Sequence, residues 1–308
     1  MGRDLAPVAE VTIAVLTFRR PQRLPALLAE LITQADTLSP PARLLVIDND
    51  PAGSAASVVA AAGRADYVHE PSPGISAARN RALDEAGGSA ALVFIDDDEL
   101  PTAGWLAQLV RCWRDWRCSV VGPVRAEFRT APPDWVIASG VFERRRRATG
   151  EPVTGAATNN LLLDLESVRC AGVRFEQDLG LVGGEDTLFS HQLLGRGAAI
   201  RWCDEAEVIE SVSPERASAR WVLRRTLRAG TSWSYMELAL AGTRAARIRT
   251  RASLWLRAFA RAGALGGLVW GLVTASPRRW APALCRLSGG AGLLLGSVGY
   301  RPREYRRP

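Results

Sequence analysis

The sequence predicts an α/β fold in which helices cover both faces of a mostly parallel sheet. Residues 11–17, 43–48 and 91–95 are short and almost continuously apolar, which is typical of parallel strands buried on both faces. Segments with helical periodicity separate them, and this alternation is typical of α/β proteins. A polar cluster follows each of the three strands. Ligands of such sheets bind beyond the carboxyl ends of the strands, so these clusters are the first candidates for a binding site.

The connecting elements follow from local patterns. Five leucine and isoleucine residues between positions 24 and 32 have the spacing of one helix face, and Pro21 suits a first helical turn. An alanine-rich helix follows the turn residues 49–53. A short strand at 66–70 leads into a helix at 74–87 that ends in glycine.

The rest of the sequence completes this α/β domain and adds a second, helical region. Strands are expected at 119–124, 155–164 and 206–212, and a glycine loop at 180–184 opens into a further helix. From Pro214 onward the pattern is helical and rich in arginine. We therefore expect a catalytic α/β domain over residues 1–212 and a helical region over 213–308.

Composition excludes several classes of site. The chain has 308 residues and 39 basic residues, all of them arginine, and its net charge is +7. Without lysine it has no P-loop phosphate lysine, Schiff-base lysine or lysine-dependent kinase site. The arginines become denser toward the end of the chain, at Arg301, Arg303, Arg306 and Arg307, beside apolar segments. This arrangement favours an anionic membrane surface over nucleic acid as the basic region's partner.

Five scattered cysteines without a CxxC pair predict buried thiols rather than a disulfide framework or a zinc site; they are Cys112, Cys118, Cys170, Cys203 and Cys285. The N-terminus lacks the apolar core of a signal peptide. The catalytic part is therefore expected in the cytoplasm.

The segment "LVFIDDDELP" (92–101) places Asp96, Asp97, Asp98 and Glu99 directly after a buried strand, where they repel one another. Such a cluster can coordinate Mg²⁺ or Mn²⁺, which take one or two protein carboxylates and complete their shell with phosphate oxygens and water. The alternative is capping of the next helix, for which one aspartate would suffice.

The segment "GGED" (183–186) is a second candidate. Two glycines allow the backbone to approach a ligand closely, and a carboxylate at the following helix start is well placed to act as a general base. The alternative is an ordinary N-cap by Asp186, with Glu185 as an acid of the first turn.

Six segments within residues 10–230 carry a family resemblance: "VTIAVLTFRRPQRL", "LLVIDND", "PSPGISAARNRAL", "LVFIDDDELPTAGWL", "TNNLLL" and "GLVGGEDTLFSHQLLGRG". They occur in the order found in family 2 glycosyltransferases of the GT-A (Rossmann-like) fold, which the chain resembles. The combination is specific, although no single segment is. The resemblance implies a nucleotide-diphosphate-sugar donor across the strand ends, a divalent metal bridging its diphosphate to the DxD-type motif, and inversion at the anomeric carbon.

The resemblance also implies roles at individual positions. The nucleotide base and ribose would lie against Thr17, Phe18 and Arg19, with Asp48 accepting a hydrogen bond from the base. Donor contacts are further implied at Gly74, Arg79, Asp96, Asp97, Asn159 and Asn160. Asp96 would reach ribose or metal, and Asp98 would bind the metal directly. Asp186 would deprotonate the acceptor hydroxyl, with Glu185 as the alternative base.

The sequence departs from the family pattern at one position. Many relatives carry a histidine that completes the metal shell late in the domain, where this chain reads "VIESVSPER". Glu210 would replace the histidine as an oxygen ligand, or the metal would have one fewer protein ligand. The alternative is that Glu210 is a strand-end acid paired with Arg216 or Arg220.

Two charge-free runs, residues 262–277 and 287–300, lie near the C-terminus. Each is shorter than the ~20 residues of a spanning helix, and Trp255, Trp270, Trp280 and Tyr300 resemble interfacial anchors. We expect a re-entrant or surface-lying hairpin at the inner face of the cell membrane, with a soluble helical cap over the catalytic domain as the alternative.

These observations predict an inverting, metal-dependent glycosyltransferase that passes a sugar, by default from UDP, to a glycan or lipid-linked acceptor, as in polysaccharide or glycolipid synthesis. One alternative is a nucleotidyltransferase, which normally has a glycine- and lysine-rich phosphate loop that is missing after Thr17. Another is an inactive nucleotide-sugar-binding subunit of a membrane assembly, which the intact acidic positions disfavour.

Overall fold

The computed structural model describes residues 10–301 and divides into two compact units. The first contains the chain up to Arg125, Arg145–Gly180 and Glu185–Glu210. The second contains Ala126–Arg144, Leu181–Gly184 and the chain from Ser211 onward. The division at residues 212 and 213 into a catalytic and a helical domain stays a prediction.

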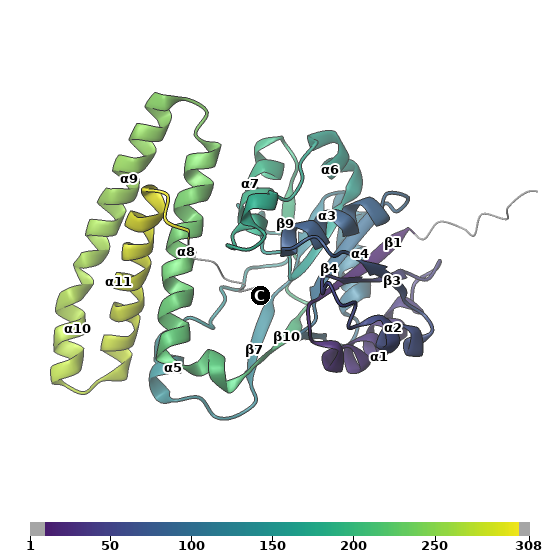
Figure 1. Cartoon of the computed structure of the whole chain (residues 1–308), viewed down its shortest axis with the longest axis horizontal. Coiled ribbons are helices and arrows are strands. Elements are labelled where there is room, and N and C mark those ends of the chain that lie inside the picture. The colour runs from purple at the N-terminus through teal and green to yellow at the C-terminus, as the bar shows by residue number, and fades with distance from the viewer. Residues whose placement is uncertain (1–9, 302–308) are drawn as a thin grey trace, which may run out of the picture. The chain divides into compact units, whose positions relative to one another are not determined.

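A seven-stranded mixed sheet forms the centre of the first unit (Figure 1), with the order β3-β2-β1-β4-β8-β6-β9. The neighbours among β1 to β4 are parallel, β8 runs antiparallel to β4 and β6, and β6 is parallel to β9. The strands are β1 Val11–Thr17, β2 Arg43–Asp48, β3 Asp66–His69, β4 Ala91–Asp96, β6 Ser119–Val121, β8 Asn160–Asp164 and β9 Ile200–Trp202.

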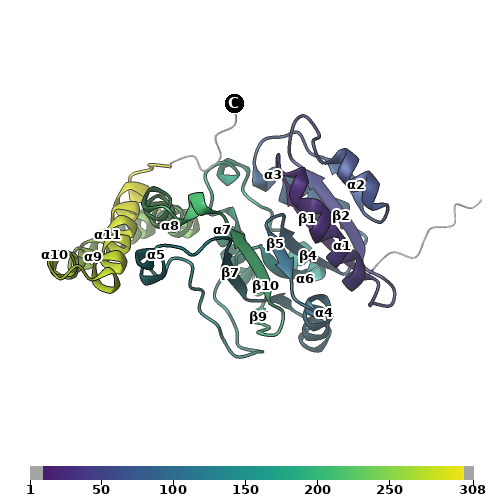
Figure 2. The ribbon, with the colours of Figure 1, turned by 90° about the horizontal axis from the view of Figure 1, so that it is seen from below.

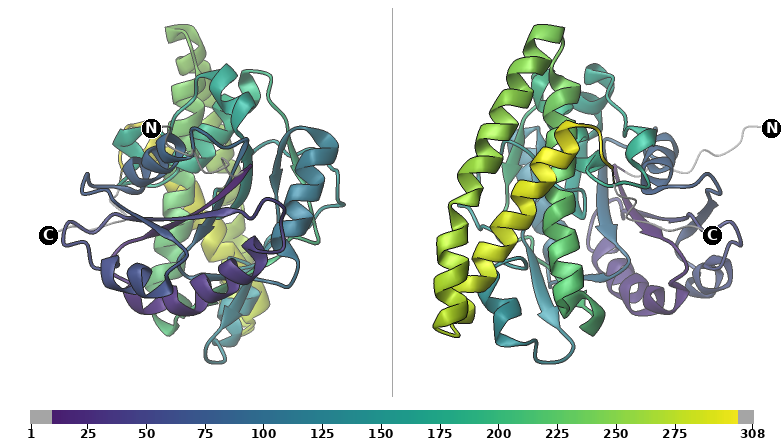
Figure 3. Two further views of the ribbon diagram at one scale, coloured as in Figure 1. Left: turned by 90° about the vertical axis from the view of Figure 1, so that its right-hand side faces the viewer. Right: turned by 60° about the vertical axis from the view of Figure 1, so that its left-hand side comes forward.

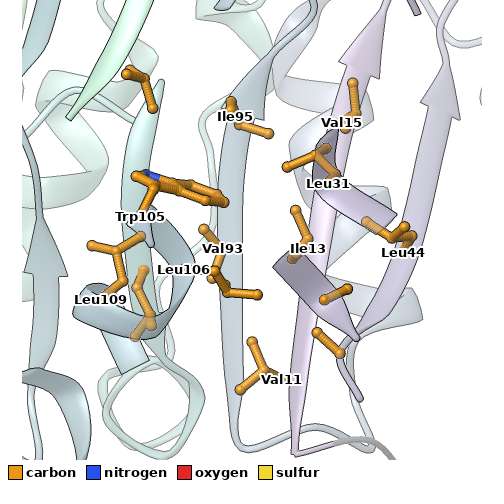
Figure 4. Packing of buried hydrophobic residues seen from close by; sticks show 14 of the residues in the cluster. Val11, Ile13, Val15, Leu31, Leu44, Val93, Ile95, Trp105, Leu106 and Leu109 are labelled. Atoms are coloured by element: carbon orange, nitrogen blue, oxygen red, sulfur yellow. The ribbon is translucent and has the colours of Figure 1, made fainter. Parts of the chain in front are cut away.

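Helices cover both faces of this sheet, because successive strand residues point to opposite sides. Ile13 and Val15 of β1 belong to one hydrophobic cluster, whereas Ala14 and Leu16 belong to another. Figure 4 shows the first cluster, in which β1 and β4 pack against residues of α1 and α4. The helices of this unit are α1 Leu24–Ala35, α2 Ala56–Ala62, α3 Ile75–Glu85, α4 Trp105–Trp116, α6 Leu165–Ala171 and α7 Glu185–Gly195. The predicted fold class is confirmed.

A second, three-stranded sheet has the order β5-β10-β7, with β5 Glu99–Pro101, β7 Val124–Phe128 and β10 Val208–Val212. Two strand predictions change. The stretch predicted as one strand over 119–124 breaks into β6 and β7, since Pro123 has no N–H for a sheet ladder. The strand predicted over 155–164 begins only at Asn160.

Five helices make up most of the second unit: α5 Asp134–Ala138, α8 Ala219–Leu240, α9 Arg244–Ala262, α10 Ala264–Val273 and α11 Pro277–Ser297. Glycines let α8 and α11 approach until their backbones meet. A Cβ on Gly292 would lie 2.1 Å from the carbonyl oxygen of Leu227, and one on Gly230 would lie 2.4 Å from that of Gly289. Figures 2 and 3 show α11 packed beside α8, α9 and α10.

This packing changes the expected apolar hairpin. The run 287–300 is largely the C-terminal half of α11, and its Leu293 and Gly296 are buried. Of the expected anchors, Trp280 stacks on Trp135 with ring centroids 6.1 Å apart. The run 262–277 contains α10, which is largely exposed and in which only Gly271 is buried. Arg303, Arg306 and Arg307 lie outside the described residues.

Within residues 10–301, one helical stretch has the length and composition of a membrane-crossing helix. It is Arg244–Val273, of 30 residues, and 11% of its most apolar window is buried.

The cysteine prediction holds in part. Cys112, Cys118 and Cys203 are buried free thiols, and the Sγ atoms of Cys112 and Cys203 are 3.3 Å apart. Cys285 is half-buried, and Cys170 is exposed near the end of α6, so the expectation of burial was wrong there.

The contact between α8 and α11 leads to a prediction with opposite signs at two glycines. Gly292→Ala should lower the free energy of unfolding by about 1–3 kcal/mol, because the new methyl group meets backbone that cannot move aside. Gly266→Ala in α10, where nothing lies within 4 Å, should raise it by up to about 1 kcal/mol through helix propensity. Thermal unfolding followed by circular dichroism measures both. Equal effects at the two positions would contradict this account of the packing.

Candidate active site

The polar residues predicted to form a site meet at one edge of the large sheet. Thr17 and Asp48 end neighbouring strands and lie opposite each other in the register of β1 and β2. Asp96 ends β4 on the other side of β1, where its partner is Leu16. The parallel sheet therefore brings together three segments that are up to 80 residues apart in the sequence.

Asp48 shapes the loop after β2. It is fully buried and accepts hydrogen bonds from the backbone N–H of Asp50 at 3.0 Å and of Ala55 at 2.8 Å. The Tyr67 hydroxyl donates to it at 3.1 Å, and burial together with the charge of Asp48 raises the pKa of Tyr67 to about 12. Arg19 donates to Asp50 at 3.2 Å. The loop expected to contact the nucleotide base is thus held by a buried carboxylate.

Arginines are the positive groups among the acids after β4. The Arg20 guanidinium lies 3.2 Å from Asp97 Oδ1 and 3.5 Å from Asp98 Oδ2, and Arg23 lies 3.5 Å from the same Asp98 oxygen. Thr17 Oγ1 donates to Asp97 Oδ2 at 2.9 Å. Sequence reasoning missed Arg20 and Arg23, although their position directly after β1, beside the end of β4, was a usable signal.

Asp96 lies among like charges. Burial raises its pKa to about 7, the Arg79 charge opposes this shift, and the Asp98, Asp97 and Glu210 charges add to it. Burial and the neighbouring acids raise the pKa of Glu99 well above its usual value. Glu210 of β10 pairs with Glu99 of β5 in the antiparallel register, which brings this late glutamate to the acids of β4.

The carboxylate oxygens at this edge of the sheet are suitable ligands for a hard divalent cation. Carboxylate oxygens are the ligands that Mg²⁺ and Mn²⁺ prefer, and a cation would offset the repulsion that Asp96 experiences. Among residues 10–301, no group of three or more histidine, cysteine, aspartate or glutamate side chains already converges as a metal site.

Glu99, which the sequence analysis named only as a member of the acidic cluster, has a specific place in the structure. Its Oε2 accepts from the backbone N–H of Asp96 at 3.1 Å, and its Oε1 accepts from Asn159 Nδ2 at 2.6 Å. It thereby links the end of β4 to the start of β8. β5, from which Glu99 projects, has three residues, too few for a recognisable alternation.

The two asparagines have different environments. Asn160 is 1% exposed, accepts from Trp105 Nε1 at 2.8 Å, and donates to the carbonyl oxygens of Pro123 and Ala206 at 2.9 and 2.7 Å. Its polar atoms are thus committed inside the protein. Asn159 is the member of the pair whose amide reaches the acidic cluster.

Arg79 of α3 connects the two acidic segments. α3 begins after Gly74, which has a φ of 113°, and a Cβ at this position would lie 3.1 Å from the Gly180 backbone, so both features require glycine. Arg79 is buried, pairs with Glu185, and lies 5.5 Å above the Phe175 ring. Its charge lowers the pKa of both Asp96 and Glu185 against the effect of burial.

Glu185 and Asp186 have different environments at the start of α7. Glu185 is buried and forms the ion pair with Arg79, and burial raises its pKa to about 7. Asp186 is half-buried, and its Oδ1 accepts from the backbone N–H of Thr187 at 2.6 Å. Gly183 and Gly184 both have φ of 90°, so two successive positions before α7 favour glycine.

Comparison with known proteins identifies the family. The model of glycosyl transferase family 2 matches residues 12–176, which include the acids after β4 and both asparagines. The chain belongs to this family. The match ends before Glu185 and Asp186, so it gives no support to either as the base.

A curated relative matches most of this chain. It is the succinoglycan biosynthesis protein ExoM of Rhizobium meliloti (strain 1021), which is 34% identical over 295 residues, covering 84% of this chain and 93% of the relative. The chain is therefore an enzyme, a glycosyltransferase related to a protein of polysaccharide biosynthesis.

Solved structures show the same fold. The mannosyltransferase PcManGT from Pyrobaculum calidifontis, in complex with GDP-Man and Mn²⁺, is 21% identical, with a TM-score of 0.59 and coverage of 96% of this chain and 90% of that chain. TarS 1-349 of S. aureus, in complex with UDP-GlcNAc, is 13% identical, with a TM-score of 0.53 and coverage of 89% and 90%. Both support the GT-A fold of the glycosyltransferase.

The crowded acids predict a pH-dependent stability of the ligand-free glycosyltransferase. A carboxyl group whose pKa is about 7 when folded, and near 4 when unfolded, makes the folded state progressively less stable as pH rises from about 4 to 7. Asp96→Asn removes this contribution, so it should raise the unfolding midpoint more at pH 8 than at pH 5. Thermal unfolding in a metal chelator measures the difference. A gain that is the same at both values would contradict the raised pKa.

Proposed function

We propose that this glycosyltransferase transfers a sugar from a nucleotide-diphosphate donor, by default a UDP-sugar, to an acceptor hydroxyl with inversion of the anomeric carbon. The observation that carries the proposal is the edge of the large sheet where Asp96, Asp98 and Arg79 lie together, next to the Asp186 segment. Such a site offers cation-binding oxygens and a buried guanidinium to a diphosphate.

Each donor group has a proposed partner. The base and ribose would lie against Thr17, Phe18 and Arg19, over the loop that Asp48 shapes. The diphosphate would meet Arg79, presented by the helix that Gly74 begins. Asp97 would orient the β4 end through Thr17, and Asn159 and Asn160 would contact or support the sugar subsite.

Mg²⁺ or Mn²⁺ is the proposed cofactor. Asp98 would be the direct ligand, with Asp96 and Glu210 as further oxygen ligands, and when bound the metal would neutralise negative charge on the leaving diphosphate. Arg20 and Arg23, which contact Asp98, would give up these contacts when Asp98 binds the metal.

In the proposed reaction the acceptor oxygen forms a bond to the anomeric carbon while the bond from that carbon to the diphosphate oxygen breaks. The proton of the acceptor hydroxyl passes to the Asp186 carboxylate, and the bonding electrons leave with the nucleoside diphosphate. Asp186 suits this role better than Glu185, because Glu185 is already engaged by Arg79. Glu185 would act chiefly by positioning that arginine.

The acceptor is proposed to be a glycan or lipid-linked glycan at the cytoplasmic face of a membrane. The relationship to a succinoglycan biosynthesis protein supports a role in polysaccharide assembly. Turnover of a panel of UDP- and GDP-sugars, followed by release of the nucleoside diphosphate, tests the reaction. Release of inorganic diphosphate instead would indicate a nucleotidyltransferase and overturn the proposal.

Metal dependence is tested at Asp98. Asp98→Ala should abolish the rise in unfolding temperature that Mn²⁺ and nucleoside diphosphate together produce in the wild-type protein, because the direct ligand is missing. Asp66→Ala, an exposed acid at the start of β3, is the control and should retain the rise. Wild-type activity that persists unchanged in excess chelator would rule out the metal.

The assignment of the base is tested at Asp186. Asp186→Asn is nearly isosteric and should lower kcat by about 10²- to 10⁴-fold with little change in donor affinity. Glu185→Gln should instead weaken donor binding, because Arg79 loses its partner. If Glu185→Gln lowers kcat and Asp186→Asn does not, the base is Glu185.

A further inference from the structure

The second unit has an apolar stripe that nothing in the described structure covers. Gly263 has helical dihedrals, φ −58° and ψ −17°, so α9 and α10 continue into one rod from Arg244 to Val273 (Figure 3, right). Seven large apolar side chains of this rod are 57% to 74% exposed. They form the apolar stripe: Ile248, Leu256, Phe259, Val269, Trp270, Leu272 and Val273.

The stripe is distinct from the face that holds the rod in its unit. Leu254 and Ala258 of α9 are buried together with Leu293 of α11. Trp255 Nε1 donates to Ser297 Oγ at 2.9 Å, and Arg257 donates to Glu237 of α8 at 2.8 Å. These contacts hold the rod to α8 and α11, and none of them involves a residue of the stripe. A run of exposed apolar side chains of this size usually marks an interaction surface.

The charge around the stripe identifies the kind of partner. Residues 238–301 contain ten arginines and no aspartate or glutamate. Arg244 and Arg249 lie at one end of the rod, and Arg278 and Arg279 follow its other end; all four are exposed and have no ion-pair partner among residues 10–301. Apolar side chains bordered by arginine match the boundary between acyl chains and anionic headgroups.

The geometry of the rod argues against crossing the membrane. The charge-free run 262–277 would measure about 24 Å as a helix, short of a hydrocarbon core of about 30 Å. Toward the N-terminus, Arg257 and Arg261 interrupt the apolar sequence, and Arg257 is tied to α8. A second copy of this chain is also a poor partner, because pairing the stripes would bring two arginine-rich surfaces together.

We propose that the stripe is a docking surface for an anionic membrane, in which the rod of α9 and α10 lies flat at the headgroup boundary while α11 stays packed on α8. This inference extends the membrane location proposed above and is independent of the proposed reaction. It replaces the apolar hairpin with a single amphipathic face.

The test is flotation of the full-length protein with vesicles of phosphatidylcholine alone or mixed with phosphatidylglycerol. We expect binding to the anionic vesicles at low salt and partial release at high salt, because salt screens the arginines and leaves the apolar contacts. Val269→Asp should weaken binding by about tenfold or more, because it replaces an apolar contact with the membrane by a charge. Val269→Leu should bind like the wild type.

The controls separate this surface from the reaction and from folding. Ser253→Asp places the same charge on an exposed position of α9 outside the stripe and should weaken binding far less. Nucleoside-diphosphate release in detergent and the unfolding temperature should be unchanged in Val269→Asp. Binding that Val269→Asp leaves intact overturns the proposal. So does a wild-type protein that ignores anionic vesicles and is a dimer that Val269→Asp converts to a monomer, which would assign the stripe to a second copy.

Discussion

The concentration of carboxyl groups at the end of β4 is the constraint to which the rest of the first unit responds. Charges this close and this buried need cations nearby, since each would otherwise shift toward its neutral form. Arg20 and Arg23 approach from the segment after β1, and Arg79 acts on Asp96 from α3. A guanidinium stays charged and can contact several oxygens at once, which suits a chain whose basic residues are all arginine. The acids after β4 and these three arginines thus form one ion-pair network.

The need of buried carboxylates for a nearby cation also gives two neighbouring acids at the start of α7 different environments. Adjacent positions at a helix start point in different directions, so only one of them can face Arg79. Glu185 has the longer side chain and is buried against it, whereas Asp186 remains half-buried beside its own helix N-terminus. The backbone N–H of Thr187 donates to Asp186, so this carboxylate is held by its own helix and not by Arg79. A half-buried carboxylate next to a buried, ion-paired one is a workable division between base and positioning residue.

The sequence predicted the strands and helices that depend on short-range patterns. β1, β2, β4, α1 and α3 follow from apolar runs and helical spacing, and the sheet then places Thr17, Asp48 and Asp96 at one edge. It missed what depends on pairing over long distances. Glu99 links the end of β4 to Asn159, 60 positions later, and the pairing of β5 with β10 brings Glu210 beside it from more than 100 positions away. Asn160 looks like a ligand in the motif, yet its hydrogen bonds go to Trp105, Pro123 and Ala206, three partners that no local pattern reveals.

The two apolar runs near the C-terminus show why composition alone could not separate core from surface. Both are rich in glycine and leucine, and glycine recurs every three to four residues in each, but the glycines have different neighbours. In α11, Gly289, Gly292 and Gly296 recur every three to four residues and form one smooth face, which a helix with Gly230 at its crossing point can approach to backbone contact. In α10 a Cβ on Gly266 would meet no atom within 4 Å, and only Gly271 is closely packed. Leucine, valine and tryptophan therefore remain on its surface. The glycines of α11 face a helix that carries its own glycine, Gly230, at the crossing point, and those of α10 largely do not face such a helix. The packing of α11 on α8 therefore depends on a matching small residue far away in the sequence, which neither mean hydropathy nor glycine spacing reveals.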